Sequence, residues 1–340
     1  MPYFLIGTQR SGSNLLRLML DQSADIVAPH PPHIMERLGV LEANYGDFGS
    51  DENFSAMVND VCHLVESNPV AWGLGEIDRS EVFGKCSKRS LVAVYGAVHD
   101  MLSVHEGARD WFCKSLANVH YIQPIEGYFG SSARYIHLHR DPRDVALSFQ
   151  NAIVGEKTWY HIAKQWQDEQ QKAFNLSRTV PTDRFLSVSY QQLTGAPKET
   201  LQAVCKFMDI NFSDAMLNFH QSNEAQSTAH AGEMWENVGR PIMTGNSNKF
   251  LTSAPLEGIA LMEYVAGESM DYLGYKKATA DWIVGAIDDV MVESFTISNQ
   301  ALKTAAIAKA PIGDLERRRP QDEAYKSIKA RLENPILAAG

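Results

Sequence analysis

Short apolar stretches alternate with longer amphipathic stretches along the first two thirds of the chain. Residues 3–6 are entirely apolar and end at Gly7, which predicts a short buried strand. The helical period over residues 13–22 then places these apolar side chains on one face: Leu15, Leu16, Met19 and Leu20. The chain therefore opens with a strand, a glycine-containing loop and a helix.

The rest of the pattern predicts further strands and helices in alternation. Buried strands are predicted over residues 111–113, 134–138 and 184–188. Helices are predicted over these residues: 53–66, 87–104, 142–149, 157–176, 197–208, 213–219, 255–310 and 320–333. Strands separated by helices imply an α/β fold with a mostly parallel sheet that helices cover on both faces. Ligands of such sheets bind at the carboxyl ends of the strands.

Two segments show little periodicity. Residues 228–254 are rich in Gly, Asn, Ser and Thr, which predicts a long functional loop. Residues 314–320 are mostly charged and end in a proline, which predicts a solvated joint between helices. Trp159 and Trp166, seven residues apart, are predicted to lie in the core.

Composition and charge narrow the classes of function. The chain has 31 Lys and Arg against 41 Asp and Glu, a net charge of −10, which argues against general nucleic-acid binding. A small anionic ligand remains compatible, because one pocket can be positive on an acidic protein. Four scattered cysteines without a CxxC pair argue against a zinc ribbon and favour a reducing compartment. Without a signal peptide or a membrane-length apolar stretch, we expect a cytoplasmic protein with no membrane partner.

The loop after the first strand has the spacing of a phosphate-binding loop. Gly7 and Gly12 have the five-residue offset of a Walker A loop, in which glycines let backbone N–H groups close around an anion. However, Ser13 and Asn14 follow Gly12 where a Walker A loop has its lysine and hydroxyl residue, and the cation is Arg10 inside the loop. This arrangement suits an anion held by a fork of N–H donors without a metal. The alternative is a plain Gly/Ser turn.

A second anion site is predicted where residues 134–138 give way to a helix. Asp141 followed by Pro142 is a strong helix start, with an N-cap oxygen and a proline at the first helical position. Arg140 precedes that helix and Ser148 lies two turns into it, so a guanidinium and a hydroxyl face the same crevice. Arg143 and Asp144, by contrast, are expected to be surface charges. Two anion-binding turns on adjacent strand ends describe a nucleotide with phosphates at two places.

These two segments resemble the cofactor motifs of the sulfotransferases that use 3′-phosphoadenosine-5′-phosphosulfate (PAPS). Residues 7–16 look like their 5′-phosphosulfate loop, in the Arg-Ser-Gly form of tyrosylprotein, carbohydrate and many bacterial members, and residues 135–148 look like their 3′-phosphate motif. The resemblance implies a P-loop-NTPase-like sulfotransferase domain over residues 1–275. Residues 276–340 match nothing in that family and are predicted to form a helical C-terminal extension packed on the same domain.

The resemblance also implies an activity and a set of cofactor contacts. The activity is in-line transfer of a sulfuryl group from PAPS to a hydroxyl or amine, without a metal, leaving the product PAP. The implied cofactor-binding residues are Arg10, Ser11, Gly12, Ser13, Asn14 and Leu15 at the 5′-phosphate, Arg140 and Ser148 at the 3′-phosphate, Tyr190 near the adenine, and Arg240 and Lys249 from the 228–254 segment. Lys114 resembles the family lysine that points at the reaction centre.

The general base is the least specific assignment. Tyrosylprotein members place a Glu in the segment after the first helix, but here the matching position falls at or beside Pro31. His30 and His33 flank that position, and histidine has a suitable pKa for a base. We expect His30 to be the base, with His33 next and Glu36 third. The alternative is that these side chains line the acceptor pocket without transferring protons.

Two other classes of function stay open on the sequence alone. A P-loop nucleotide-dependent kinase predicts dependence on ATP and Mg²⁺, and the missing lysine after Gly12 counts against it. A non-catalytic nucleotide-binding protein is favoured if the missing Glu means lost chemistry. The acceptor, whether a small molecule, a peptide or a glycan, leaves no signature, and the C-terminal helices are compatible with a homodimer.

Overall fold

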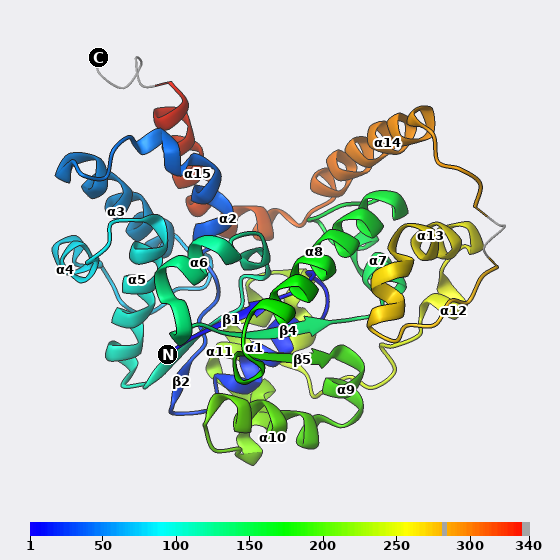
Figure 1. Ribbon diagram of the computed structural model, residues 1–340, viewed down its shortest axis with the longest axis horizontal. Coiled ribbons are helices and arrows are strands. Elements are labelled where there is room, and N and C mark those ends of the chain that lie inside the picture. The colour runs from blue at the N-terminus through cyan, green and yellow to red at the C-terminus, as the bar shows by residue number, and fades with distance from the viewer. Residues whose placement is uncertain (281–283, 335–340) are drawn as a thin grey trace.

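A five-stranded parallel sheet forms the centre of the protein, as the computed structural model shows for residues 1–280 and 284–334 (Figure 1). The strands are β1 Pro2–Ile6, β2 Ile26–Val27, β3 Asp110–Cys113, β4 Arg134–His139 and β5 Phe185–Ser189. Their order across the sheet is β2-β3-β1-β4-β5, and every neighbouring pair is parallel. The predicted α/β class and four of these strands are confirmed. The edge strand β2 was missed because two residues are too few to show a period.

Helices cover both faces of the sheet. The α-helices are α1 Ser13–Leu20, α2 Ile34–Leu38, α3 Asp51–Glu66, α4 Arg79–Lys85, α5 Leu91–Glu106, α6 Ile122–Phe129, α7 Pro142–Gln150, α8 Trp159–Thr179, α9 Tyr190–Gly195, α10 Pro197–Met208, α11 Asn223–His230, α12 Phe250–Ser253, α13 Leu256–Tyr272, α14 Asp289–Ala308 and α15 Ile312–Glu333. Short 3-10 turns join them, of which η1 Gly39–Tyr45, η2 Leu116–His120, η5 Asp214–Gln221 and η6 Glu233–Gly239 matter below.

The two faces of the sheet bury separate cores, because alternate residues of a strand point to opposite sides. Tyr3 and Leu5 of β1 pack in one core with α1 and α10, whereas Phe4 and Ile6 pack in the other with α3 and α5. A third cluster joins α7, α8 and α13 around the fully buried Trp166, with Trp159 packed against its edge. The prediction that Trp166 lies in the core is confirmed, whereas Trp159 is only partly buried at the edge of the core.

The chain reverses its direction across the sheet between β1 and β4. From β1 it passes outward to β2 and returns through β3, whereas from β4 it passes to β5 on the other side. In the register of the two strands, Ile6 lies beside His137, so the loops that follow β1 and β4 leave the same edge side by side. Such a reversal point is where open α/β sheets bind their ligands.

The predicted long loop over residues 228–254 is wrong for about half of its length. The last turn of α11, η6 and α12 occupy that half, and residues 231–232 and 240–249 are irregular. Ser222 caps α11 by accepting a hydrogen bond from the Ala225 N–H, and the helix buries only the small side chains of Ala225 and Thr228. Small buried residues give no apolar period, so composition misled the prediction. The helix predicted over 255–310 is two helices, α13 and α14, and the described residues between them, 273–280 and 284–288, are not helical.

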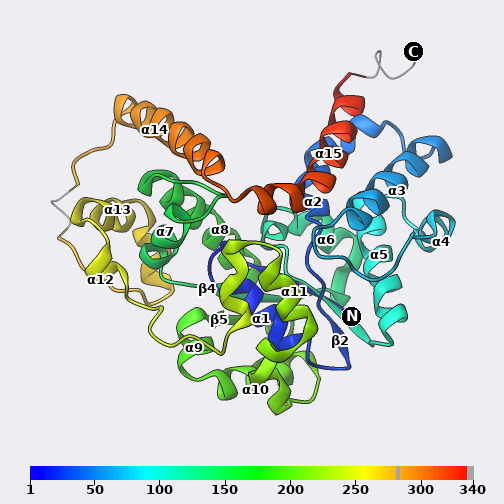
Figure 2. The same ribbon diagram turned by 180° about the vertical axis from the view of Figure 1, so that it is seen from behind.

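The predicted joint over residues 314–320 is also wrong, because α15 runs through it. Asp314 is buried and accepts a hydrogen bond from the Glu233 N–H, which no solvated joint would do. Pro320 lies inside the helix, where it lacks an N–H donor. Figure 2 shows the helix changing direction part-way along, so the proline bends the helix without ending it.

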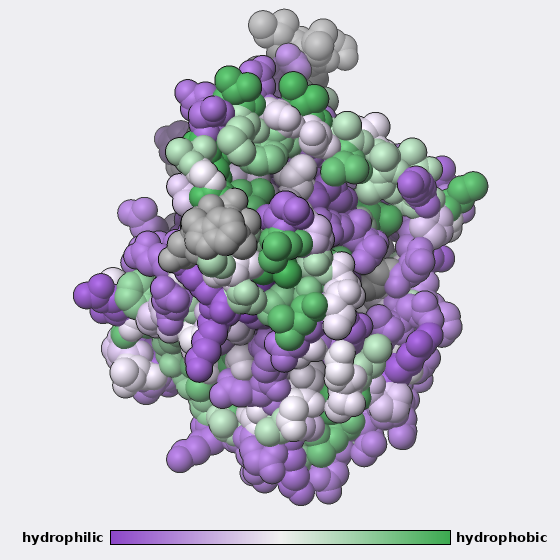
Figure 3. Space-filling model, turned by 90° about the vertical axis from the view of Figure 1, so that its right-hand side faces the viewer, coloured by the Kyte–Doolittle hydropathy of each residue, from purple (hydrophilic) through white to green (hydrophobic). Residues whose placement is uncertain are grey.

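The two C-terminal helices pack on different parts of the same body. α15 lies against α3 and η1, and α14 lies along the start of α8, where Asn299 is its buried residue. The face of α14 opposite the buried Asn299 carries the exposed apolar side chains of Val290 and Ile297, and Leu302 is exposed nearer the side of Asn299. Figure 3 views this side of the molecule and shows hydrophobic residues interspersed with hydrophilic ones over its upper part. Among the residues the structure describes, no helix is both long and apolar enough to cross a bilayer.

Candidate functional site

The loop between β1 and α1 is held in a conformation that its glycines make accessible. Gly7 has φ 130°, and a Cβ there would stand 2.3 Å from the carbonyl oxygen of Leu138. Gly12 has φ 93°, and a Cβ there would stand 2.6 Å from the ring of Tyr190. Both positions therefore exclude a side chain for lack of space as well as for backbone strain. The loop packs against the next strand on one side and against the Tyr190 ring on the other.

The N-terminus of α1 points its unpaired N–H groups out of this loop. α1 begins at Ser13 directly after Gly12, no side chain caps it, and its first turn holds no acidic residue. The first N–H groups of the helix are consequently free to bind an anion, which the helix dipole also favours. This is the geometry that the glycine spacing predicted.

The second predicted turn, after β4, forms around its cap as expected but differs in its charges. The Asp141 carboxylate accepts a hydrogen bond from the Arg143 N–H at 3.0 Å and starts α7. Arg143 and Asp144, predicted as surface charges, are buried. Arg143 pairs with Asp141 and with Glu263 at 2.5 Å. Asp144 accepts hydrogen bonds from the N–H groups of residues 248 and 250, so both side chains fasten distant segments to α7.

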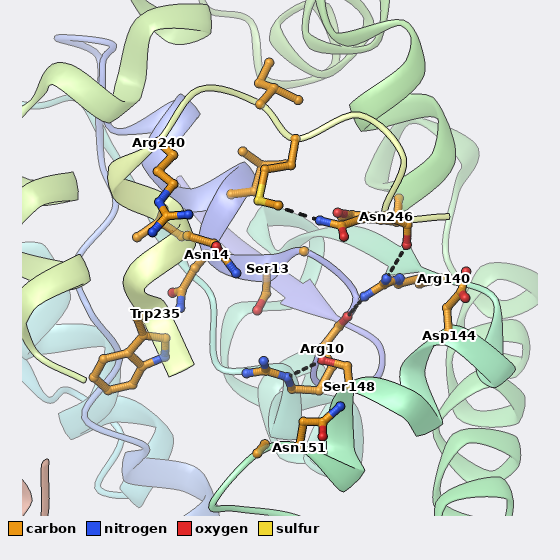
Figure 4. Close-up of a pocket in the computed structure, with 18 of the residues that line it drawn as sticks. Arg10, Ser13, Asn14, Arg140, Asp144, Ser148, Asn151, Trp235, Arg240 and Asn246 are labelled. Carbon is orange, nitrogen blue, oxygen red and sulfur yellow. Dashed lines mark hydrogen bonds between the residues drawn. The ribbon is translucent and has the colours of Figure 1, made fainter. Parts of the chain in front are cut away.

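Arg10 and Arg140 meet in the crevice between the two turns. The Arg140 Nη1 donates to the carbonyl oxygen of Arg10 at 2.9 Å, and its Nη2 donates to that of Asn246 at 2.6 Å. The Arg10 Nε donates to the Ser148 hydroxyl at 2.9 Å. The Arg140 guanidinium also lies 4.3 Å from the centre of the Tyr190 ring. Figure 4 shows Arg10, Ser148, Arg140 and Asn246 joined by these bonds.

Arg140, which is buried, and Arg10, which is partly buried, differ from the remaining buried arginines in having no carboxylate within ion-pair distance in the described structure. Arg17, Arg143 and Arg184 form ion pairs, whereas no ion pair of Arg10 or Arg140 occurs within residues 1–280 and 284–334. Burial and then repulsion by Arg140 lower the pKa of Arg10 to about 10. Asp144 lines the same cavity and interacts electrostatically with Arg140. Even so, two neighbouring positive charges that form no ion pair favour the binding of an anion.

A cavity of about 480 Å³ opens over this pair. Of the predicted cofactor-binding residues, those that line it are Arg10, Gly12, Ser13, Asn14, Leu15, Arg140, Ser148, Tyr190, Arg240 and Lys249. Ser11 is buried beneath the loop and does not line it. Arg240 is exposed and pairs with Glu236, and Lys249 is exposed at the start of α12. Ten of the 11 predicted positions thus border one cavity.

Lys114 comes directly after β3 and does not line this cavity. It is partly covered, and no hydrogen bond or ion pair of its ammonium occurs in the described part of the chain. Burial, reinforced by the charges of Arg17 and Arg10, lowers the pKa of Lys114 to about 7. A bound anion would oppose this shift, because it favours the charged form of the lysine.

His30 lies deeper, at the carboxyl end of the β2 segment. Its ring packs edge-on against Trp235, a residue of the main cavity, with 4.8 Å between ring centres. The same histidine borders a second cavity of about 350 Å³, along β2. Burial, followed by the charges of Lys114 and Arg17, holds the pKa of His30 well below its ordinary value. The ring is therefore neutral near pH 7.

His33 and Glu36 form a pair nearer the surface. The His33 Nδ1 and the Glu36 Oε2 are 2.9 Å apart, and His33 takes a left-handed backbone conformation with φ 59° before α2. Burial opposes ionisation of Glu36, but the His33 ring and the nearby Arg37 and His120 hold the pKa of this carboxyl below its ordinary value. Neither His33 nor Glu36 lines the main cavity.

Comparison with known proteins assigns the chain to a family. A family model described as the sulfotransferase family matches residues 2–214, more than half of the 340 residues. The chain belongs to the sulfotransferase family. A search of curated proteins returned no match. The matched segment carries β1 to β5 and both anion-binding turns.

Solved structures show the same fold. The sulfotransferase domain of the olefin synthase from Synechococcus PCC 7002 is 22% identical, with a TM-score of 0.50, over 77% of this chain and 94% of that domain. The sulfotransferase domain from the curacin biosynthetic pathway is 20% identical, also with a TM-score of 0.50, over 81% of this chain and 99% of that domain. The P-loop-like fold that the motifs implied is thereby confirmed.

The family uses PAPS, and the cavity residues of this sulfotransferase fit such a nucleotide. Three buried polar atoms at the two turns have no hydrogen-bond partner among the described residues: the Ser11 Oγ, the Asn14 Oδ1 and the Arg140 Nε. The donors are guanidinium, hydroxyl, amide and helix N–H groups, which bind phosphate oxygens, and the Tyr190 ring offers an aromatic face. The described residues contain no group of three His, Cys, Asp or Glu side chains placed to hold a metal.

Several cavity residues of this sulfotransferase were not predicted. The backbone carbonyl oxygen of Asn246 accepts a hydrogen bond from Arg140. A backbone contact of this kind leaves no motif in the sequence. Trp235 and Asp314 close the end toward His30. Asp314 comes from the C-terminal extension, some 165 residues beyond the second motif, so its place depends wholly on tertiary packing. Only the Trp, a large aromatic side chain in the polar 228–254 segment, was visible as a signal.

Proposed function

We propose that this chain binds PAPS in the main cavity and transfers its sulfuryl group to a hydroxyl or amine of an acceptor. The observation that carries the proposal is the meeting of Arg10 and Arg140, two cations without a carboxylate partner, over the N-terminus of α1. A ligand with two phosphate groups would supply the ion-pair partners that the described protein residues do not.

The two turns would take the two ends of the nucleotide. Arg10 and the N–H groups at the start of α1 would hold the 5′-phosphate, and Arg140 and Ser148 would hold the 3′-phosphate. Tyr190 would lie against the adenine. Arg240 and Lys249, both exposed at the rim, would contribute positive charge from the covering segment. PAPS, when bound, supplies an activated sulfuryl group on a phosphate leaving group.

The chain's own groups then supply electrostatics and a base. Arg10 would stabilise the charge that develops on the leaving phosphate oxygen, and the desolvated Lys114 would stabilise the oxygens of the group in transfer. His30, neutral and with an unpaired Nε2, would accept the acceptor's proton. The His33–Glu36 pair lies nearer the surface as a second candidate base.

Two measurements test this function. PAP should raise the melting temperature of the protein, while Mg-ATP should raise it little, because no lysine follows Gly12. A larger rise with Mg-ATP would favour a kinase. Incubation with labelled PAPS and a panel of phenols, alcohols and amines should then give label transfer to at least one acceptor class. PAP binding without transfer to any of them would favour a non-catalytic nucleotide-binding protein.

The acceptor and the partner also belong to the proposal. The acceptor, a small molecule or a peptide or glycan group, would enter the main cavity on the side of Trp235, the residue against which the His30 ring packs. A homodimer through α14 is compatible with its exposed apolar side chains Val290 and Ile297, which lie on one face of the helix. Sedimentation of the wild-type protein and of Ile297→Glu tests that association.

A further inference from the structure

A buried glutamine of the C-terminal extension reaches the segment that carries His30. Gln321 of α15 is 3% exposed. Its Nε2 donates to the Leu64 carbonyl oxygen at 2.9 Å and lies 3.4 Å from the Asn68 Oδ1. Its Oε1 accepts from the Arg37 guanidinium at 3.3 Å. The amide therefore has one orientation, with its oxygen on a cation and its nitrogen on oxygens.

Asn68 is oriented in the same way. Its Nδ2 donates to the carbonyl oxygens of His30 at 2.8 Å and of Val70 at 3.0 Å. A flipped amide would set its oxygen against both carbonyl oxygens and lose both bonds, so the Oδ1 must face the His30 ring. The Asn68 Oδ1 stands 3.3 Å from the His30 Nδ1 and also faces the Gln321 Nε2.

This orientation determines the tautomer of His30. An amide oxygen is only an acceptor, so the Nδ1 of His30 must carry the hydrogen that lies between them. A neutral imidazole has a single N–H, so its Nε2 carries a lone pair. The Nε2 is buried and has no partner among the described residues. The Trp72 Nε1, which donates to the His30 carbonyl oxygen at 2.7 Å, and the Trp235 ring fix the position of the ring.

The charges around His30 keep the ring neutral. The charged groups facing it are Lys114 after β3, Arg17 of α1 and His33 of its own segment, and each disfavours a second proton on the ring. The hydrogen bond to Asn68 acts in the opposite direction, and burial outweighs it. The ring is thus a neutral acceptor at the Nε2 over the physiological range.

We propose that Asn68 is a positioning residue that holds His30 in the tautomer with a free Nε2, and that Gln321 of the C-terminal extension fixes Asn68. The proposal rests on the proposed role of His30 as the base. It also gives residues 276–340 a part in the site, which the sequence did not reveal. If the two amides had only a structural role, hydrogen-bonding to buried carbonyl groups, their removal would not change the tautomer of His30.

The test is nitrogen NMR of the intact protein with isotope-labelled histidine. His30 is one of 11 histidines, so its signals are assigned by their absence in His30→Gln. Asn68→Ala removes the acceptor and Asn68→Asp retains one. Gln321→Ala removes only the outer contact. The matched control is Asn175→Ala, at an exposed helical asparagine that bonds only to Gln171.

The wild type should show His30 with its hydrogen on the Nδ1. Asn68→Ala should populate the other tautomer and lower kcat by about tenfold or more, with the KM for PAPS unchanged. Gln321→Ala should act in the same direction but less, and Asn175→Ala should change neither quantity. Asn68→Asp should restore the tautomer and, because its carboxylate raises the pKa of His30, move the acidic limb of the pH profile to higher pH.

The outcomes separate the two claims. A hydrogen on the Nε2 of wild-type His30, or a tautomer that Asn68→Ala leaves unchanged, would overturn the proposal, and the wild-type measurement needs no variant to fold. If the tautomer responds as described but turnover does not, the positioning of the ring by Asn68 stands and the role of His30 as the base falls.

Discussion

Replacing Arg140 by alanine should weaken PAP binding by about 30-fold to 150-fold. Two of the five N–H groups of this guanidinium donate to the carbonyl oxygens of Arg10 and Asn246, and the others, including the buried Nε, are free for a phosphate. A charge-assisted contact of this kind contributes about 2–3 kcal/mol, and each 1.4 kcal/mol or so is tenfold in affinity. The loss should fall on ligand binding, because Arg140 has no ion pair in the described structure to break.

The assay is the rise in melting temperature caused by PAP, measured at a ligand concentration about 100 times the wild-type Kd. The wild type should gain about 2.7 kcal/mol, and a variant weakened about 100-fold should gain about 0.4 kcal/mol. For 340 residues these gains correspond to rises of roughly 4 °C and less than about 1 °C. Arg178→Ala, at an exposed arginine of α8, is the matched control and should behave as wild type. Equal rises in wild type and Arg140→Ala would refute the assignment of the 3′-phosphate site.

Further predictions concern the reaction centre and the loop. PAP binding at about pH 8 should be accompanied by uptake of close to one proton, because Lys114, with a pKa of about 7, is mostly neutral there and a bound phosphate restores its charge. Calorimetry in buffers of different ionisation enthalpy measures this uptake, and Lys114→Met should show none. His30→Ala should lower kcat by about 10²-fold or more while PAP affinity stays within about twofold, and unchanged turnover would place the base elsewhere. Gly7→Ala should lower the free energy of unfolding by more than about 2 kcal/mol in denaturant titrations, because its Cβ meets the Leu138 carbonyl, whereas Gly84→Ala, in open space on α4, should not destabilise.

The features that could be predicted from the sequence are those that depend on neighbouring residues alone, such as the two anion-binding turns. The two turns could be predicted from Gly7, Gly12 and the Asp141-Pro142 pair, because the backbone requirements of these residues are the same in any fold. The structure shows both turns beside each other. Arg10 and Arg140 could be placed in one crevice because parallel strands end at the same edge of a sheet. The roles of these residues toward PAPS stay predictions until binding is measured.

Features that depend on distant partners could not be predicted. In the sequence, Arg143 and Asp144 look like surface charges. Their buried partners, the Glu263 carboxylate and the Phe250 N–H respectively, lie more than 100 residues further along the chain. α11 buries only small residues and so shows no apolar period. Likewise, a proline at position 320 predicts the end of a helix, yet α15 continues through it. Distant contacts of α15, such as the hydrogen bond from Gln321 to the Leu64 carbonyl oxygen, could not be predicted from the local sequence.

A comparison of PAP with AMP, which lacks the 3′-phosphate, tests most directly whether two arginines hold opposite ends of one nucleotide. Titration calorimetry would measure both ligands against the wild type, Arg10→Ala and Arg140→Ala. Arg140→Ala should weaken PAP about 100-fold yet leave AMP within about threefold, whereas Arg10→Ala should weaken both ligands. Equal weakening of PAP and AMP by Arg140→Ala would contradict the account.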